Sequence, residues 1–313
     1  MAAPGTPVAE LPSVIVKDAS GNPIAGVPVT FATTAGGGSV TGGHATSNSA
    51  GVATVGSWTL GPNPGTNVLV AATGSLSVTF TAEGADPCRT FVVHTFGTTS
   101  NGKLTASDCD LGDGSFVDLY SVTIASPGTY LFTQTGNFDT YLFLFASSGH
   151  IVAENHTAGQ VNTSVVKAIL PAGTFVLGAN SLHASVTGDY TLTSAATTPE
   201  VSNCEDVFVV AGISSQQSLQ SSDCTSNGVF SDNYLIFLPA GQMITVSMTS
   251  SAVDSYLEVY AIGGTSPLAT NDNIDGTTQN AQLAFTAGAT GYYIVKARSA
   301  APGATGAYTI AVQ

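Results

Sequence analysis

The 313-residue sequence predicts an all-β protein of three consecutive β-sandwich domains. No useful length of chain carries the 3.6-residue spacing of apolar positions that an amphipathic helix needs. Short runs rich in β-branched and aromatic residues alternate instead with turn-forming residues, and the chain contains 35 glycines and 14 prolines. Its length suits two or three domains of ordinary size.

The first domain is expected over residues 1–84. Val14 and Val16 share one face of an extended run, and a turn-forming stretch separates this run from a second one, VPVTF. A sandwich sheet needs a partner for each edge that it exposes. Pro4 and Pro7 make the residues before the first run poor strand material. The sequence therefore leaves open what covers that edge.

Residues 85–197 and 198–313 repeat each other. FDTYLFLF in the first copy answers VDSYLEVY in the second, and GDYTLTS answers GAYTIAV. The matched blocks keep an offset of 115 to 118 residues. A nearly constant offset over several blocks indicates a duplicated domain.

The duplication also predicts how the four cysteines pair. One pair per copy favours the disulfides Cys88–Cys109 and Cys204–Cys224 over the other two connectivities. Each bridge closes a loop of about twenty residues, which is worth about 3 kcal/mol of stability. A zinc site would need Cys-x-x-Cys or Cys-His spacing, and neither occurs. Disulfides indicate an oxidising compartment, so we expect a secreted, cell-surface-associated protein.

Both copies resemble the bacterial pre-peptidase C-terminal (PPC) domain, which implies a jelly-roll or sandwich fold for each. The motifs that carry the resemblance are Asp118-x-Tyr120 and Asp232-x-Tyr234, Asp139–Leu142 and Asp254–Leu257, and the closing Gly188–Thr191 and Gly306–Thr309. The recurring aspartates are expected at strand starts, where a carboxylate accepts hydrogen bonds from backbone N–H groups.

Residues 1–84 resemble bacterial Ig-like repeats of the invasin and intimin type, through KDASGNPIAGVPVTF, AGGGSVTGG, NSAGVATVGSWTLG and LSVTFTAEG. Trp58 is expected in the core. The resemblance implies a further strand before the first run, so we expect an unpaired edge with part of a hydrophobic groove. Such an edge is a template for a strand of another chain. The alternative is that Ala2–Glu10 folds back to cover it.

Catalytic motifs are missing from the sequence, and we expect that the protein is not an enzyme. There is no Gly-x-Ser-x-Gly elbow, no His-Glu-x-x-His and no glycine-rich loop that leads into a helix. His150, Glu154 and His156 have a spacing that could ligate a metal, but a solvated loop explains them equally well.

Two acidic stretches could bind calcium, which prefers six to eight oxygen ligands. They contain Asp272, Asn273 and Asp275, and Asp108, Asp110 and Asp113. The first stretch lacks the EF-hand spacing and the distal glutamate, and its residues also suit a simple turn. No other cofactor is expected.

The charge balance limits the partners. Six basic and twenty acidic residues give a net charge of −14, which disfavours nucleic acid. The longest strongly apolar run, YLFLFA, is too short to span a bilayer. The remaining partners are other copies of the chain, other surface proteins or polysaccharide.

Two functions agree with these observations. The first is a structural or adhesive protein of a bacterial surface, as a rod or as a head-to-tail filament in which Ala2–Val8 or Ala307–Gln313 completes the first edge of a neighbour. The second is a non-catalytic appendage of a secreted hydrolase that binds polysaccharide or protein. For the second, the adjacent Tyr292 and Tyr293 must place one ring outward for sugar stacking.

Overall fold

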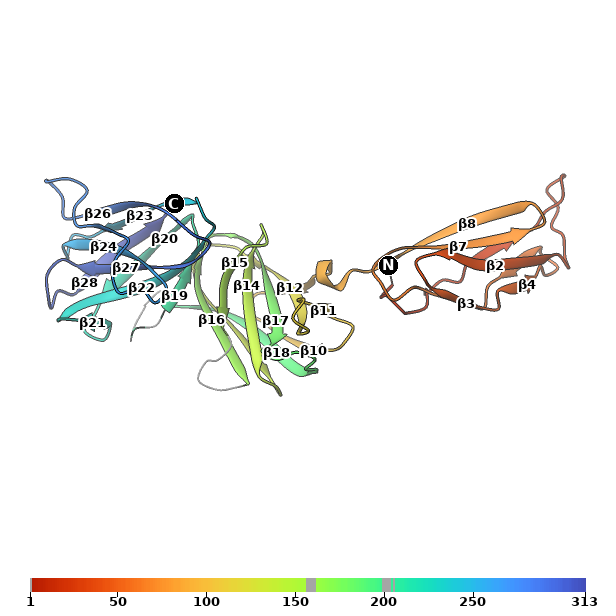
Figure 1. Cartoon of the computed structure of the whole chain (residues 1–313), viewed down its shortest axis with the longest axis horizontal. Coiled ribbons are helices and arrows are strands. Elements are labelled where there is room, and N and C mark those ends of the chain that lie inside the picture. The colour runs from red at the N-terminus through yellow and green to blue at the C-terminus, as the bar shows by residue number, and fades with distance from the viewer. Residues whose placement is uncertain (1, 156–161, 199–203, 205) are drawn as a thin grey trace. The chain divides into compact units, whose positions relative to one another are not determined.

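The computed structural model describes residues 2–155, 162–198, 204 and 206–313 (Figure 1). The predicted all-β class is confirmed: the described residues form strands, with one short 3-10 turn and no α-helix. In this part of the chain, therefore, no helix has the length and apolar character needed to span a bilayer. The contacts divide the chain once, into unit 1 (Met1–Thr90) and unit 2 (Phe91–Gln313). The expected boundary between residues 197 and 198 falls inside unit 2.

Unit 1 contains one four-stranded sheet, with the order β4-β2-β7-β8, and two two-stranded sheets, β1-β5 and β3-β6. Its strands are β1 Ser13–Ile15, β2 Pro28–Ala35, β3 Ser39–Thr41, β4 His44–Thr46, β5 Val52–Thr54, β6 Ser57–Thr59, β7 Gly65–Thr73 and β8 Leu76–Gly84, and the 3-10 turn η1 Pro87–Arg89 follows them.

The core of unit 1 follows from strand alternation. In β2, Val29 and Phe31 are buried while the residues between them are exposed, as expected of a strand with one face on a core. Trp58 is 2% exposed and belongs to the same cluster, so its predicted place in the core is confirmed. Gly74, at φ +56°, opens the tight turn that joins β7 to β8.

In copy 1, two sheets face each other: β10-β18-β13-β16 and β12-β17-β14-β15, with β9 and β11 both paired to β12. The strands are β9 Val92–His94, β10 Thr99–Leu104, β11 Cys109–Asp110, β12 Phe116–Ile124, β13 Gly128–Gly136, β14 Thr140–Ala146, β15 Ile151–Asn155, β16 Thr163–Leu170, β17 Gly173–Ser181 and β18 Gly188–Thr197.

Copy 2 repeats this plan, with the sheets β20-β28-β23-β26 and β22-β27-β24-β25, and with β19 and β21 both paired to β22. The strands are β19 Asp206–Val209, β20 Ile213–Leu219, β21 Cys224–Ser226, β22 Val229–Leu238, β23 Met243–Thr249, β24 Ser255–Ala261, β25 Ala269–Asn271, β26 Ala281–Thr286, β27 Gly291–Ser299 and β28 Gly306–Val312.

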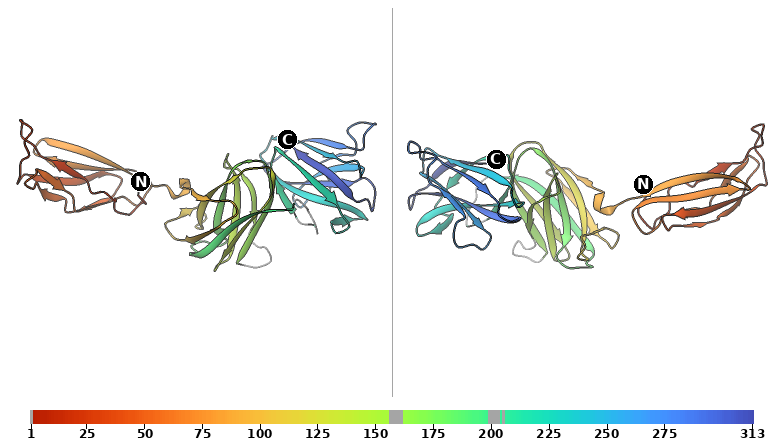
Figure 2. Two further views of the ribbon diagram at one scale, coloured as in Figure 1. Left: turned by 180° about the vertical axis from the view of Figure 1, so that it is seen from behind. Right: turned by 45° about the horizontal axis from the view of Figure 1, so that its top comes forward.

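The two copies are joined by β19. This strand pairs in parallel with β16 of copy 1 on one edge and with β22 of copy 2 on the other. The result is a ten-stranded sheet that runs through both copies (Figures 1 and 2). Each copy still has its own buried cluster between its sheets.

Candidate functional site

The Asp-x-Tyr and closing Gly-x-Tyr motifs build the same hydrogen-bonded triad in each copy. In copy 1, the Tyr190 hydroxyl lies 2.8 Å from that of Tyr120 and donates to Asp118 Oδ2 at 2.5 Å. In copy 2, the hydroxyls of Tyr234 and Tyr308 lie 2.6 Å apart, and Tyr308 donates to Asp232. Asp118 and Asp232 thus accept hydrogen bonds from tyrosine hydroxyls. Their expected bonds with backbone N–H groups stay a prediction.

Burial decides the electrostatics of these triads. Desolvation raises the pKa of Asp118 to about 6, although the hydrogen bond from Tyr190 opposes the shift. Burial, more than any neighbouring charge, also raises the pKa of Tyr234 and of Tyr308 well above the ordinary tyrosine value. Tyr234 is fully buried and Tyr308 is 3% exposed, so the copy 2 triad is part of the core. These groups stabilise the sandwich.

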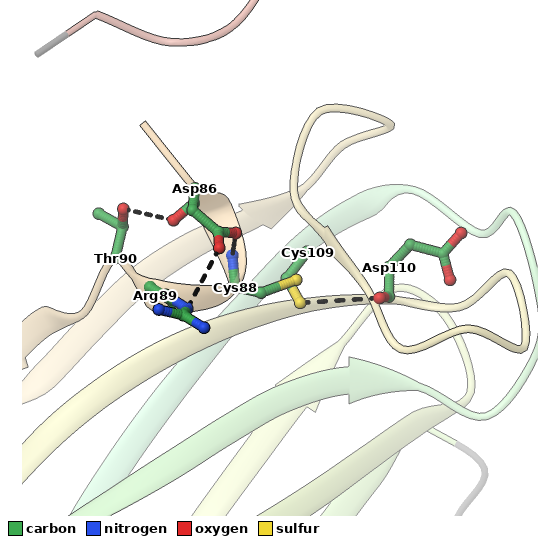
Figure 3. Close-up of polar contacts among 6 residues, drawn as sticks. All are labelled: Asp86, Cys88, Arg89, Thr90, Cys109 and Asp110. Atoms are coloured by element: carbon green, nitrogen blue, oxygen red, sulfur yellow. Dashed lines mark hydrogen bonds and ion pairs between the residues drawn. The ribbon is translucent and has the colours of Figure 1, made fainter. Parts of the chain in front are cut away.

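Disulfides are present in both copies. Cys204 and Cys224 are bonded, with 20 residues of sequence separation. Cys88 and Cys109 are also disulfide-bonded, and since no cysteine is free they must join each other. Figure 3 shows Cys88 beside Asp86, whose carboxylate accepts the Cys88 backbone N–H at 2.9 Å. The bridges agree with an oxidising compartment.

The acidic stretch beside Cys109 is used by its own turns. Asp108 Oδ2 accepts the Thr105 N–H at 2.6 Å. Asp110 Oδ1 accepts the N–H groups of Gly112 and Gly114 at 2.7 and 3.1 Å. Asp113 Oδ1 accepts both the N–H and the hydroxyl of Ser115, which lowers the pKa of Asp113. The carboxylates therefore serve as caps of separate turns.

In the second acidic stretch, a carboxylate also accepts hydrogen bonds within its own turn. Asp275 Oδ1 accepts the N–H and the hydroxyl of Thr277 at 2.8 and 2.6 Å, and these bonds lower the pKa of Asp275. The Asn273 carbonyl accepts from Asn271, and Asp272 lies next to it. Among the described residues, no group of three or more His, Cys, Asp or Glu side chains could hold a metal ion. Calcium binding at either stretch stays a prediction.

Of the predicted histidine cluster, Glu154 accepts the Tyr141 hydroxyl at 2.8 Å, and His150 lines a cleft between the copies. His156 lies outside the described residues.

Tyr292 and Tyr293 do not form an exposed pair. Tyr293 is 6% exposed in the copy 2 core and donates to the Ala289 carbonyl at 2.7 Å. Tyr292 packs edge-on against Phe208 and Phe237, with ring centroids 5.8 and 5.3 Å away. Burial, followed by the Glu154 carboxylate of copy 1, raises the pKa of Tyr292. Tyr292 therefore lies on the face opposite Tyr293 and is partly buried there. Sugar stacking by this pair stays a prediction.

The N-terminal segment pairs within its own chain, but with β6 and not with the first strand, β1, whose only strand partner among the described residues is β5. The expected missing strand beside β1 stays a prediction. Val8 N–H donates to the Trp58 carbonyl at 2.8 Å, and Leu60 N–H donates to the Thr6 carbonyl at 3.0 Å. The N-terminal segment thus lies along β6 of its own chain. The other expected donor, Ala307–Gln313, contains β28, which pairs on one side with β20 and on the other with β23. Both segments are already used within the chain.

The longest open strand edge among the described residues of unit 1 belongs to β8. β8 pairs with β7 along its whole length, and within the described residues its other edge forms backbone bonds only with Ala2, at Glu83 and Gly84. From Leu76 to Ala82 the outer edge has no backbone partner among the described residues. Because Ala2 N–H donates to the Glu83 carbonyl, the outward backbone groups belong to Glu83, Thr81 and every second residue before them.

A groove of about 740 Å³ follows this edge. Its walls are Phe80–Glu83 on one side and Pro7–Ser13 on the other, and Trp58 contributes to its lining. Phe80 and Ala82 are partly buried against the core, so the groove reaches the interior of the sandwich. The buried Trp58 Nε1–H has no hydrogen-bond partner in the described part of the chain.

Charge and apolar surface extend the groove. Glu10 gives it an acidic residue, while the Glu83 carboxylate accepts the Thr66 hydroxyl on the other face of the sheet. Leu76 and Val78, which continue the face of Phe80 along β8, are 70% and 51% exposed. The sequence analysis placed the open edge at the first strand and missed this one. LSVTFTAEG carries the signal: an alternating, proline-free strand with only one charge.

Comparisons with known proteins give similarity of fold. No family model matches the chain, and no curated protein does. The pre-peptidase C-terminal domain of collagenase from Bacillus anthracis is 18% identical, with 34% of this chain and 95% of that one covered and a TM-score of 0.28. The M60 catalytic domain with two CBM51 domains of Clostridium perfringens ZmpB is 10% identical, with 80% and 42% covered and a TM-score of 0.22.

A third structure, a triple jelly-roll protein described with the turret assembly of an archaeal virus, is 11% identical, with 98% of this chain and 82% of that one covered and a TM-score of 0.22. Part of the chain is similar in structure to a pre-peptidase C-terminal domain. The Ig-like resemblance of residues 1–84 stays a resemblance. At these identities and scores the similarities concern the fold alone.

Proposed function

We propose that this protein is a non-enzymatic, extracellular structural or adhesive protein of a bacterial surface, and that unit 1 supplies an adhesive contact. The observation that carries the proposal is the open β8 edge beside an apolar groove. Disulfides in both copies support the extracellular location. The triads, the acidic turns and the aromatic residues described above all have structural roles, which leaves this groove as the surface best suited to a partner.

The occupant is an extended segment of another protein. The unpaired N–H and C=O groups from Leu76 to Ala82 select an extended backbone, which adds to β8 as a further strand. Because side chains alternate between the two faces of such a strand, every second side chain lies over Phe80 and the groove. Glu10 in the lining of the groove favours a lysine or arginine at one end of the segment.

Thr81→Pro tests this contact. Proline removes the outward N–H of residue 81 and leaves the ladder with β7 intact, because that N–H does not point toward β7. The matched control is Thr81→Val, which keeps the N–H. A random dodecapeptide library displayed on phage is selected on the full chain, and the enriched peptides are then measured against both variants.

We expect enriched peptides with alternating apolar residues and a basic end, and a loss of affinity of about tenfold or more for Thr81→Pro only. Peptides that bind both variants equally, or a library without enrichment, would contradict the proposal.

A polysaccharide-binding appendage is the second candidate, favoured by a cleft of about 680 Å³ in copy 2. Amide and hydroxyl side chains line it, including Gln216, Gln217, Ser250 and Asn280. Such groups suit the hydroxyls of a sugar, and Gln217 Oε1 has no hydrogen-bond partner among the described residues. A glycan array on the wild type and on Gln217→Ala separates the candidates: binding that the variant loses favours the appendage.

A further inference from the structure

The two copies in unit 2 have matching sheets. The order β10-β18-β13-β16 in copy 1 corresponds strand for strand to β20-β28-β23-β26 in copy 2. Likewise, β12-β17-β14-β15 corresponds to β22-β27-β24-β25, and β9 corresponds to β19. Both β9 and β19 run parallel to the next strand of their copy, with Val92 opposite Tyr120 and Val207 opposite Tyr234. Each copy therefore has the same two outer strands.

Inside the chain, one of these outer strands meets the other. β16 of copy 1 pairs in parallel with β19 of copy 2, with Ala168 opposite Phe208 and Ile169 opposite Val209. Ile169 belongs to the core cluster of copy 2, while Phe208 packs against the cluster of copy 1. This joint is heterologous, because one copy contributes a surface of the β16 kind and the other a surface of the β19 kind.

In the described part of unit 2, the matching strands at its two ends each have one edge without a strand partner. β9, which matches β19, bonds only to β12, and its other edge has no backbone partner in the described residues. β26, which matches β16, bonds only to β23 within its sheet. The chain thus carries, at opposite ends of its repeat, the two halves of a contact that it already makes once internally.

One side-chain bond to β26 has a counterpart on β16, which is paired to β19. Asn271 Oδ1 accepts the Gln282 N–H at 2.9 Å. In copy 1, Asn155 Oδ1 accepts the Val165 N–H at 3.4 Å in the corresponding place. The bond between Asn155 and Val165 does not prevent β16 from pairing with β19 four residues farther along, at Ile169. The corresponding position on β26 is Thr286, at the exposed end of the strand.

Exposed apolar side chains gather at the same two ends. Of the eight large apolar side chains exposed in the described part of unit 2, six lie there. Phe91, Val92 and Val93, at 49%, 55% and 75%, lie in or next to β9. Met243, at 67%, is the register partner of Thr286. Ile262 and Leu268 lie between β24 and β25, and the matching β14–β15 connection faces Val209 and Val210 across a cleft at the internal joint.

At one position, the free β9 end is more polar than the internal joint between β16 and β19. Phe237 and Tyr292, which pack together at the joint, correspond to the register pair Thr123 and Thr174 in copy 1. We therefore expect a contact between chains to be weaker than the joint within the chain.

From these observations we infer that β26 of one chain pairs in parallel with β9 of a second copy of the same chain, which repeats the internal joint between molecules. The occupant of each edge is a second copy, because the surface that fits β9 inside the chain is that of β16, and β26 is its counterpart. A heterologous contact of this kind extends into an open-ended, head-to-tail assembly unless it closes into a ring. With a net charge of −14, such chains repel each other, so added salt strengthens the assembly.

The experiment uses the full chain and three lysine variants. Val93→Lys blocks the β9 end, and Met243→Lys blocks the β26 end. Ile274→Lys is the control, since Ile274 is exposed in a turn outside both ends. Sedimentation velocity over a range of concentrations, at two salt concentrations, reports the size of the assemblies. The melting temperatures of all chains verify that they are folded.

We expect the wild type and Ile274→Lys to form a growing series of sizes. Each end variant alone stays monomeric, because a charge without a partner in the contact weakens association by about tenfold or more. An equimolar mixture of Val93→Lys and Met243→Lys forms dimers and stops there, since each chain retains one intact end.

A wild type that is monomeric at every concentration, a single closed dimer, or a mixture of end variants that stays monomeric would overturn the inference. Its outcome is separate from that of the adhesive contact. Thr81→Pro leaves this assembly unchanged, and Val93→Lys leaves peptide binding along β8 unchanged.

Discussion

The two copies in unit 2 share one strand plan, yet their first strands have different surroundings. β19 has a neighbour on each edge, and Val207 and Val209 are buried. β9 has a neighbour on one edge, and Val92 and Val93, which match Val207 and Phe208, are exposed. His94, which matches Val209, is buried as Val209 is. The burial of the first two positions therefore differs with the neighbour on the second edge. The predictions below test this difference, beginning with the largest effect.

The largest effect is expected from the disulfides, where the copies should be alike. Replacing Cys204 and Cys224 by serine opens a loop of 20 residues and should cost about 3 kcal/mol of unfolding free energy. The Cys88 and Cys109 pair closes a loop of similar length and should cost about the same. Urea unfolding measures both, and a loss below about 1 kcal/mol for either pair contradicts this equivalence.

Substitutions at matching positions of β19 and β9 should change the stability of the protein by different amounts. Phe208→Ala removes a ring that packs against copy 1 and against Tyr292, and should destabilise unit 2 by about 2 kcal/mol. Val93→Ala, at the matching place on β9, changes a side chain that is 75% exposed and should cost less than about 0.5 kcal/mol. Thermal unfolding at low protein concentration compares the two, and equal losses would mean that β9 is covered in the isolated chain.

The hydrogen bonds of the two triads should contribute differently to the free energy of unfolding, because the aspartates are buried to different extents. Tyr308→Phe removes the hydroxyl that donates to Asp232, which is 1% exposed, and should cost about 1 to 2 kcal/mol. Tyr190→Phe removes the corresponding donor to Asp118, which is only half-buried, and should cost less. Chemical unfolding of both variants gives the order, and a larger loss for Tyr190→Phe would contradict the role of burial.

The smallest effect is a pH dependence in copy 1. The pKa of Asp118 is about 6 in the folded chain and near 3.8 when unfolded, so the folded state binds the extra proton between these values. The contribution of Asp118 to stability is therefore complete below about pH 4 and is lost as the pH rises through 6. Melting temperatures of the wild type and Asp118→Asn over pH 4 to 7 test it: the variant should lack this decline.

Most of the fold could be predicted because it depends on local patterns. Strand alternation and turns predicted the all-β class, and the matched blocks predicted two copies of one strand plan. One cysteine pair per copy predicted the bridge between Cys204 and Cys224.

The sites were predicted less well, because they depend on long-range contacts. Tyr292 alternates with the core residue Tyr293, as a solvent-facing residue would, yet it is partly buried against Phe208 and Phe237. Pro4 and Pro7 disfavour a regular strand, but one backbone hydrogen bond at Thr6 and one at Val8 are enough to join this segment to the edge of β6. The open edges of β8, β9 and β26 depend on sheet order, and a sequence of strands does not specify that order.

Hydrogen exchange of the β9 and β19 amides at several protein concentrations tests the central claim most directly. At low concentration, we expect the amides of 206–209 to exchange far more slowly than those of 92–94, because only β19 is paired on both edges. As the concentration rises, protection of 92–94 should increase toward that of 206–209, and Val93→Lys should prevent the increase. Equal protection of both strands at low concentration, or a β9 that exchanges rapidly at every concentration, would contradict the account.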